Sequence, residues 1–221
     1  MRTIFQKHLD SLEQDLFTMA DKVIDAIRKS VLALKNQDLN EAKRIIDNDI
    51  LINNKRWEIE ETCIKLIATQ QPVASDLREL IAILNIITDL ERMGDYAEGI
   101  ARIVLKLGNS TPVKALIDIP RMEDIAIEMI QKSLRAYAER DDLKARAIST
   151  QDDEIDQLYN QIQRELISIM IEDPSKITRS TYLLWASHNL ERIGDRVTNI
   201  CERIIYLVTG EMIENISRES E

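Results

Sequence analysis

The sequence predicts an all-α protein of six helices forming two pseudo-symmetric three-helix bundles. Glycine and proline are scarce, with five and four among 221 residues, so long helices are rarely interrupted. Hydrophobic residues recur at helical spacing, and the alternation typical of strands is absent. The segment DLERMGD at 89–95 returns as NLERIGD at 189–195, 100 residues later. This repeat indicates that the chain consists of two similar halves.

Three helices are expected in the first half. Asp38 and Glu41 fit a capping box that opens the second helix. Pro72 ends that helix, and Ser75 is the expected N-cap of the third. The expected ranges are Thr3–Lys35, Asp38–Thr69 and Asp76–Leu107.

Three more helices are expected in the second half. Pro120 suits the first turn of a helix that reaches Glu139. The next helix runs from the turn Arg140–Asp142 to Glu172. Asp173 and Pro174 then fit an N-cap and first helical position, opening a helix that ends near Val208. The predicted division is a first bundle at 1–110, a linker at 111–119 and a second bundle at 120–221, whose charged tail 216–221 is expected to fray.

The repeated segment places two carboxylates on one face of a helix. Glu91 and Asp95 are four residues apart and so point in nearly the same direction. Gly94 lies between this acidic stripe and the apolar face, although a glycine within a helix costs about 1 kcal/mol relative to alanine. Its recurrence as Gly194 predicts close approach of another helix or of a ligand.

A second polar pair is expected opposite each copy of the repeat. If each loop joins antiparallel helices, residues equidistant from the loop lie at the same height, and four oxygen-bearing side chains meet in each half. No lysine accompanies them, so a bound cation is the simplest relief of their repulsion. Oxygen ligands suit hard ions such as Mg²⁺ and Mn²⁺, and bridging carboxylates also hold iron. The predicted metal ligands are Asp49, Asn53, Glu91 and Asp95, and Asp152, Asp156, Glu191 and Asp195.

Two other interpretations of these carboxylates stay open. An acidic pair four residues apart is easily tolerated as a solvated face, because the repulsion in water is small. The acidic faces are also suited to docking Arg or Lys side chains of a partner protein. His188 lies one turn before Glu191 and is expected either to touch the second site or to be a partly buried helix residue.

Several function classes are disfavoured. Neither His8 nor His188 follows a glutamate by three residues, as a di-iron bundle requires, and no nucleophile–base set or phosphate loop is present, so we predict no enzyme. A net charge of -10 without a basic patch argues against nucleic acid. The N-terminus resembles no signal peptide, no apolar run approaches a membrane span, and Cys63 and Cys201 are expected as buried free thiols in a reducing cytoplasm.

The two repeated segments, together with QPVASDLR at 71–78, resemble the PhoU family, and the resemblance covers nearly the whole chain. It implies a cytoplasmic, non-enzymatic regulator of phosphate uptake, peripheral to the membrane at most. Such proteins connect a phosphate ABC transporter with a sensor histidine kinase, and many are homodimers. A role beside a secondary phosphate transporter is the alternative within the superfamily.

The resemblance also implies multinuclear metal clusters on acidic motifs. In this sequence the motif corresponds to Glu91/Asp95, Glu191/Asp195 and Asp152/Asp156. At Asp49/Asn53 the second position is an amide, so we expect weaker metal binding or a different nuclearity in the first half. The candidate ions are iron, manganese, magnesium and zinc.

Overall fold

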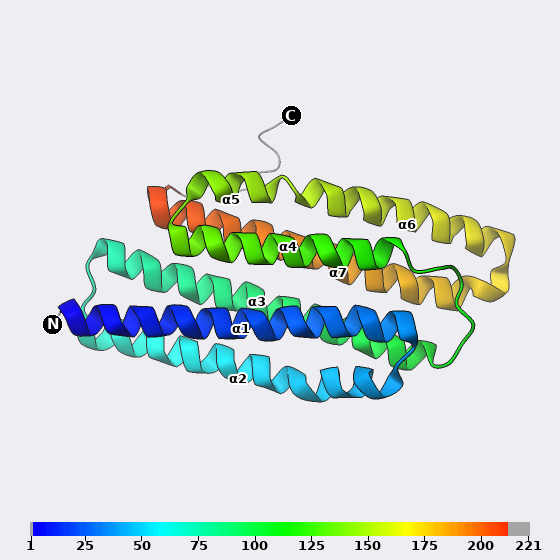
Figure 1. Ribbon diagram of the computed structural model, residues 1–221, viewed down its shortest axis with the longest axis horizontal. Coiled ribbons are helices and arrows are strands. Elements are labelled where there is room, and N and C mark those ends of the chain that lie inside the picture. Colours follow the sequence, from blue (N-terminus) through cyan, green and yellow to red (C-terminus); the bar gives the residue numbers. More distant parts are fainter. Residues whose placement is uncertain (1, 212–221) are drawn as a thin grey trace.

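The computed structural model describes residues 2–211, except for the side chains of residues 2–4, and the tail expected to fray lies outside this range. The predicted all-α class and the two three-helix bundles are confirmed (Figure 1). The elements are α1 (Arg2–Asn36), α2 (Leu39–Gln70), α3 (Ala74–Leu107), α4 (Asp118–Glu139), α5 (Asp142–Ser149), α6 (Asp152–Glu172), the 3₁₀ turn η1 (Pro174–Lys176) and α7 (Ile177–Thr209).

In the first bundle, the predicted N-cap of α2 is confirmed and the predicted N-cap of α3 is not. Asp38 caps α2, because its carboxylate accepts hydrogen bonds from the backbone N–H groups of Asn40 and Glu41. The prediction of Ser75 as the N-cap of α3 is wrong. Gln71 adopts a left-handed conformation that ends α2, and the chain enters α3 directly from Val73, so Ser75 is already within the first turn.

The predicted fifth helix is present but divided at Thr150 and Gln151, which separate α5 from α6. Neither glycine nor proline marks this break. Instead, the hydroxyls of Ser149 and Thr150 donate to the backbone carbonyls of Arg146 and Ala147 in the last turn of α5. These side chains compete with backbone N–H groups for the same carbonyl acceptors. The break is consistent with this competition.

The remaining starts are shifted by a few residues. Pro120 lies in the first turn of α4, which begins two residues earlier at Asp118. Asp173 acts as the predicted cap, since its carboxylate accepts from the N–H of Ser175, but it caps the 3₁₀ turn that precedes α7.

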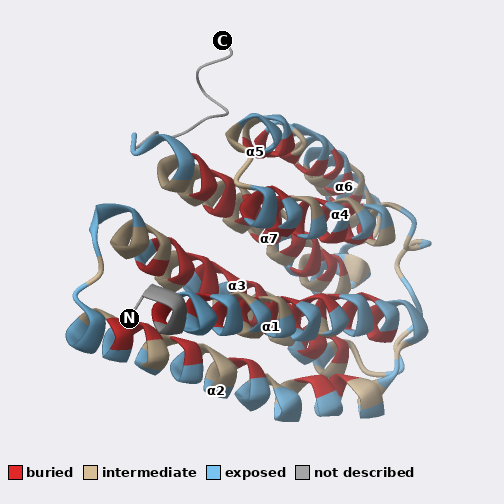
Figure 2. Ribbon diagram, turned by 60° about the vertical axis from the view of Figure 1, so that its left-hand side comes forward, coloured by how far each residue is buried: buried red, intermediate tan, exposed pale blue. Residues whose placement is uncertain are grey.

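The two bundles share one hydrophobic core, and α3 packs against α7 more extensively than any other pair of helices. The buried faces of α3 and α7 turn inward between the bundles in Figure 2. At this interface the carboxylate of Asp89 accepts hydrogen bonds from Asn199 (3.2 Å) and Arg196 (3.4 Å). A Cβ built at Gly99 would lie 3.0 Å from the amide nitrogen of Asn189. Because Asp89 and Asn189 are equivalent positions of the repeat, these contacts occupy related places on the two helices.

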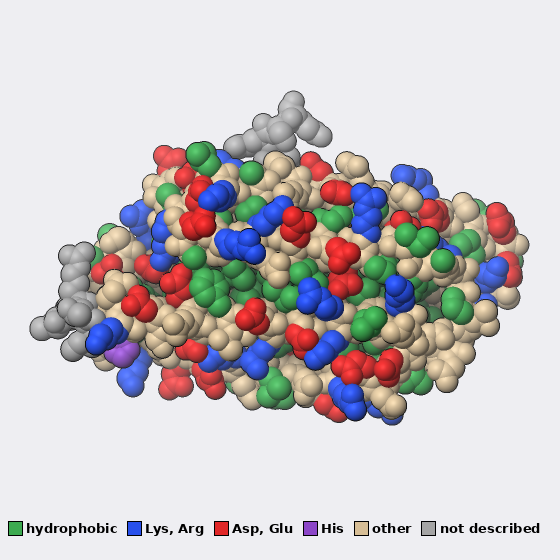
Figure 3. Space-filling model, viewed as in Figure 1, with side chains coloured by type: hydrophobic (Ala, Val, Ile, Leu, Met, Phe, Trp, Pro, Cys, Tyr) green, Lys and Arg blue, Asp and Glu red, His purple; other side chains and the backbone are tan. Residues whose placement is uncertain are grey.

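The remaining sequence expectations concern thiols and surface. Cys63 and Cys201 are free and buried as predicted, and burial raises the pKa of each thiol to about 12. Acidic and basic side chains are interspersed over the face shown in Figure 3. Among the described helices, none has the length and apolar character needed to cross a membrane.

Candidate functional site

The glycines of the repeat allow a neighbouring helix to approach closely. A Cβ built at Gly194 would lie 2.3 Å from Oδ1 of Asp152 and 3.0 Å from Cδ1 of Ile155, both on α6. One built at Gly94 would lie 3.1 Å from Cδ1 of Ile52 on α2, with Oδ1 of Asp49 at 3.6 Å. The predicted close approach is therefore present in both halves, and the partner is the preceding helix of the hairpin.

In the first half, Asp49 of α2 faces the acidic stripe of α3. Burial raises the pKa of Asp49, and the nearby charges of Glu98, Asp95 and Glu91 raise it further, whereas a hydrogen bond from Asn53 lowers it. This bond joins Nδ2 of Asn53 to Oδ2 of Asp49 at 2.7 Å. The predicted ligands of this half thus lie together, and Glu98, absent from the predicted set, belongs to the same cluster.

In the second half, Asp152 is the most buried member of the cluster, at 7% exposure. Burial raises its pKa to about 7, assisted by the charges of Asp156, Asp195 and Glu191. Burial likewise raises the pKa of Glu191 to about 7, with Asp195 and Asp156 adding to the effect. The pKa of Asp156 is raised by burial and by Asp195. All four predicted residues therefore influence one another electrostatically.

Arginines of the repeat neutralise part of this charge. Arg92 binds Asp95 at 3.1 Å, and Arg192 binds Asp195 at 2.7 Å, each within its own helix. The predicted repulsion took account only of lysine as a cationic partner, whereas in each stripe an arginine three residues before the aspartate on the same helix supplies the positive charge. One carboxylate of each stripe is therefore paired with an arginine of its own helix.

His188 does contact the second site. Its Nδ1 lies 3.2 Å from Oε2 of Glu191, and that oxygen forms no hydrogen bond. The ring also packs against Tyr159, with the ring centroids 5.8 Å apart. His188 thus adds a nitrogen donor beside the oxygen cluster.

The donor chemistry of both clusters fits a cation. Three buried oxygens of the two clusters lack a hydrogen-bond partner: Oδ1 of Asn53, Oδ1 of Asp152 and Oε2 of Glu191. Such buried acceptors are costly unless a donor or cation satisfies them. Within the described residues, however, no three His, Cys, Asp or Glu side chains are arranged so that they could hold one ion. Metal ligation therefore requires some of these side chains to turn.

Sequence reasoning missed the role of Asp89, the first residue of the repeated segment. Asp89 is 8% exposed and joins α3 to α7 through Arg196 and Asn199. Burial raises its pKa, and the two partners oppose that shift. The sequence places Asp89 and Asn189 at equivalent positions of the repeat, but only the packing of α3 against α7 shows what these side chains contact.

A family model described as the PhoU domain matches the chain twice, over residues 16–104 and 119–204. A "Phosphate-specific transport system accessory protein PhoU homolog" of Clostridium acetobutylicum is 42% identical, covering 96% of this chain and 98% of the relative. The Escherichia coli K12 protein called "Phosphate-specific transport system accessory protein PhoU" is 35% identical, with 96% and 88% covered.

Solved structures agree with these matches. The crystal structure of the phosphate transport system regulatory protein PhoU from Streptococcus pneumoniae superposes with a TM-score of 0.88 at 36% identity, covering 95% of this chain and 99% of that one. PhoU from Pseudomonas aeruginosa gives 0.89 at 34% identity, with 94% and 100% covered. These names describe accessory and regulatory proteins, in agreement with the prediction that this chain is not an enzyme. The chain belongs to the PhoU family, whose repeated domain accounts for both of its bundles.

Proposed function

We propose that this protein is a cytoplasmic adaptor that regulates phosphate uptake, acting between a phosphate ABC transporter and a sensor histidine kinase. The observation that carries the proposal is the match of nearly the whole chain to accessory and regulatory proteins of phosphate-specific transport. Such a role requires surfaces for protein partners rather than a catalytic pocket.

The outer face of α2 offers such a surface. Ile50, Trp57 and Ile64 are 50%, 56% and 56% exposed, and their spacing of seven residues aligns them in one stripe. The corresponding positions of α6 are Asp153, Asn160 and Ile167, so two of the three are polar where α2 has Ile50 and Trp57. Large exposed apolar groups aligned on one helix favour a docking role over a purely solvated face.

The adaptor role is tested by deleting the gene and measuring phosphate-starvation transcripts in phosphate-rich medium. We expect derepression, which the wild-type gene reverses and a Trp57→Glu/Ile64→Glu variant does not. The matched control is Asn160→Glu, which adds charge at the corresponding exposed place on α6 and should restore repression. Normal repression in the deletion strain contradicts the adaptor role. Full rescue by the stripe variant contradicts the docking face alone.

We propose that the acidic side-chain clusters bind divalent or trivalent metal ions in multinuclear metal clusters, with iron, manganese, magnesium and zinc as candidates. The unpartnered buried oxygens of Asn53, Asp152 and Glu191 support this assignment. Metal analysis of natively purified protein tests it, beside the variant Asp156→Asn/Asp195→Asn. We expect the variant to lose the second site's metal. The control Asp10→Asn/Asp21→Asn removes two exposed carboxylates of α1 and should keep it. Equal metal content in wild type and in the acidic-site variant refutes the assignment.

The rival role of the acidic clusters is to dock Arg or Lys side chains of a partner. It predicts that a chelator leaves partner binding intact, whereas Asp195→Asn weakens it.

We propose that the protein is a homodimer, which light scattering on the purified protein tests. Pull-down with each class of transporter decides between an ABC transporter and a secondary transporter as the partner.

A further inference from the structure

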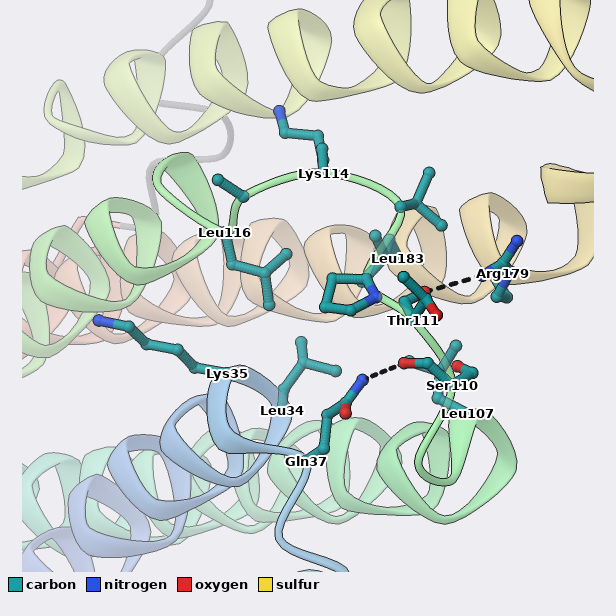
Figure 4. Close-up of a pocket in the computed structure, with 13 residues that line it drawn as sticks. Leu34, Lys35, Gln37, Leu107, Ser110, Thr111, Lys114, Leu116, Arg179 and Leu183 are labelled. Carbon is teal, nitrogen blue, oxygen red and sulfur yellow. Dashed lines mark hydrogen bonds between the residues drawn. The ribbon is translucent and has the colours of Figure 1, made fainter.

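A cavity of about 300 Å³ lies where the connection between the halves passes the end of α1 and the start of α7. Leu34 of α1, Leu116 of the connection and Leu183 of α7 converge on it (Figure 4). Its size is at the lower end of the roughly 300–1,000 Å³ usual for small-molecule sites. Its walls thus come from both bundles and from the segment that joins them.

Two hydrogen bonds hold the connection beside this cavity. The side-chain amide of Gln37, at the end of α1, donates to the carbonyl of Ser110. Nη1 of Arg179, near the start of α7, donates to the carbonyl of Thr111 at 2.8 Å. The cavity is therefore bounded by a connection tied to both bundles, as Figure 4 shows.

The charge around the cavity opposes that of the whole molecule. The protein has a net charge of -10, yet the cavity is lined by Lys35, Lys114 and Arg179 and by no carboxylate. Lys114 is committed elsewhere, because it pairs with Asp118 and Glu165. Within the described structure, neither Lys35 nor Arg179 forms an ion pair, and they stand on opposite sides of the cavity in Figure 4.

Arg179 is the better placed of these two cations. It is half-buried, whereas Lys35 is exposed. The bond to Thr111 uses one of its five N–H donors and fixes the position of the guanidinium. A planar guanidinium binds carboxylates through two parallel hydrogen bonds, which a lysine ammonium cannot do.

We propose that this cavity binds a small amphipathic anion of the medium-chain carboxylate class. The apolar chain fills the space between Leu34, Leu116 and Leu183, and the carboxylate pairs with Arg179. Because the walls belong to both bundles, the bound anion stabilises their joined arrangement by mass action. This site lies on different residues from the acidic clusters and from the α2 stripe, so it stands independently of the proposed function.

The test is a calorimetric titration of the full-length protein with decanoate and, separately, with decanol. The two probes share the apolar chain and differ in the carboxylate. We expect decanoate to bind with one-to-one stoichiometry and decanol to bind at least about tenfold more weakly, as loss of a charge-assisted hydrogen bond implies. Equal affinities, or no binding of decanoate, overturn the proposal.

Two variants locate the bound anion. Arg179→Gln should weaken decanoate about tenfold and leave decanol unchanged. Leu116→Trp fills the cavity and should abolish binding of both probes, and it lies in the connection, so no helix is altered. The matched controls are Arg44→Gln and Leu143→Trp at exposed sites elsewhere, which should bind decanoate as wild type does. Unchanged decanoate binding in Leu116→Trp refutes this cavity as the site.

Discussion

The two acidic clusters share one helix packing but differ in their charge and in their hydrogen bonding. In the second half, Asp152 faces Asp156, Asp195 and Glu191, so all four groups are carboxyls. In the first half, Asn53 replaces one carboxyl, and its amide donates to Asp49. The amide both removes a charge and satisfies a neighbour. The hydrogen bond from this amide thus relieves Asp49 in the first cluster, and the four carboxyls of the second cluster have no equivalent donor among them.

The two clusters also differ in the side-chain atom that lies nearest to the glycine of the repeat. A Cβ at Gly194 would lie 2.3 Å from a carboxylate oxygen of Asp152, whereas the nearest atom to one at Gly94 is a methyl carbon of Ile52 at 3.1 Å. The position equivalent to His188 is Thr88, whose hydroxyl donates to the carbonyl of Leu84 rather than toward the cluster. The duplication thus kept the helix geometry, while the donor set diverged.

The largest effect is expected from Asp152→Asn in metal-free protein. The pKa of Asp152 is raised in the folded state from 3.8 to about 7, so its stabilising contribution is present below pH 3.8 and is lost as the pH rises toward 7. At pH 8 the ionised carboxylate opposes folding, and Asn should raise the free energy of unfolding by about 2 kcal/mol. Urea unfolding with a chelator present measures the change.

The pH dependence provides the control for that prediction. At pH 3.5 wild type and Asp152→Asn should unfold at nearly the same urea concentration, because Asp152 is protonated in the folded state and mostly protonated in the unfolded state. Asp49→Asn should give a smaller gain at pH 8, since Asn53 already donates to Asp49. A gain for Asp152→Asn that does not depend on pH contradicts the electrostatic explanation.

The next effect compares Gly194→Ala with Gly94→Ala. The new methyl group at position 194 displaces the buried carboxylate of Asp152, so we expect a net loss of about 1–2 kcal/mol despite better helix propensity. At position 94 the flexible end of Ile52 can move aside, and stability should stay within about 0.5 kcal/mol of wild type. Equal losses in urea unfolding would show that the carboxylate of Asp152 makes room for the new methyl group as easily as Ile52 does.

Most helices and both clusters could be predicted from the sequence, because periodicity and the repeat carry that information. Gly94 and Gly194 indicated a close approach, and equal distance from each loop indicated which side chains meet. The break after Ser149 could not be predicted, since hydroxyl groups that fit within a helix here bond to its carbonyls. The role of a residue that contacts the other bundle, such as Asp89, could not be predicted from residue spacing within one helix.

Partners of the carboxylates were the weakest part of the sequence prediction. Opposing heights placed the acidic groups together correctly, but they do not reveal where each side chain turns. Asp95 and Asp195 turn toward Arg92 and Arg192 of their own helices, a choice among rotamers that spacing leaves open. The cavity beside the connection was missed for a related reason, since a loop of irregular structure has no periodicity to read.

The smallest effect, and the sharpest test of the difference between the halves, is Asn53→Asp. The change adds a fifth carboxylate to Asp49, Glu91, Asp95 and Glu98, and it removes the amide that donates to Asp49 at 2.7 Å. Without metal the variant should therefore be less stable than wild type, because two carboxylates then face each other. With Mn²⁺, titration calorimetry in the Asp156→Asn/Asp195→Asn background should show about tenfold tighter binding, or about 1.4 kcal/mol. Asn54→Asp, on the exposed side of α2, adds the same charge outside the cluster and should leave Mn²⁺ affinity unchanged. If both variants bind Mn²⁺ alike, the amide does not distinguish the two halves, and the divergence of the donor set has no consequence for metal.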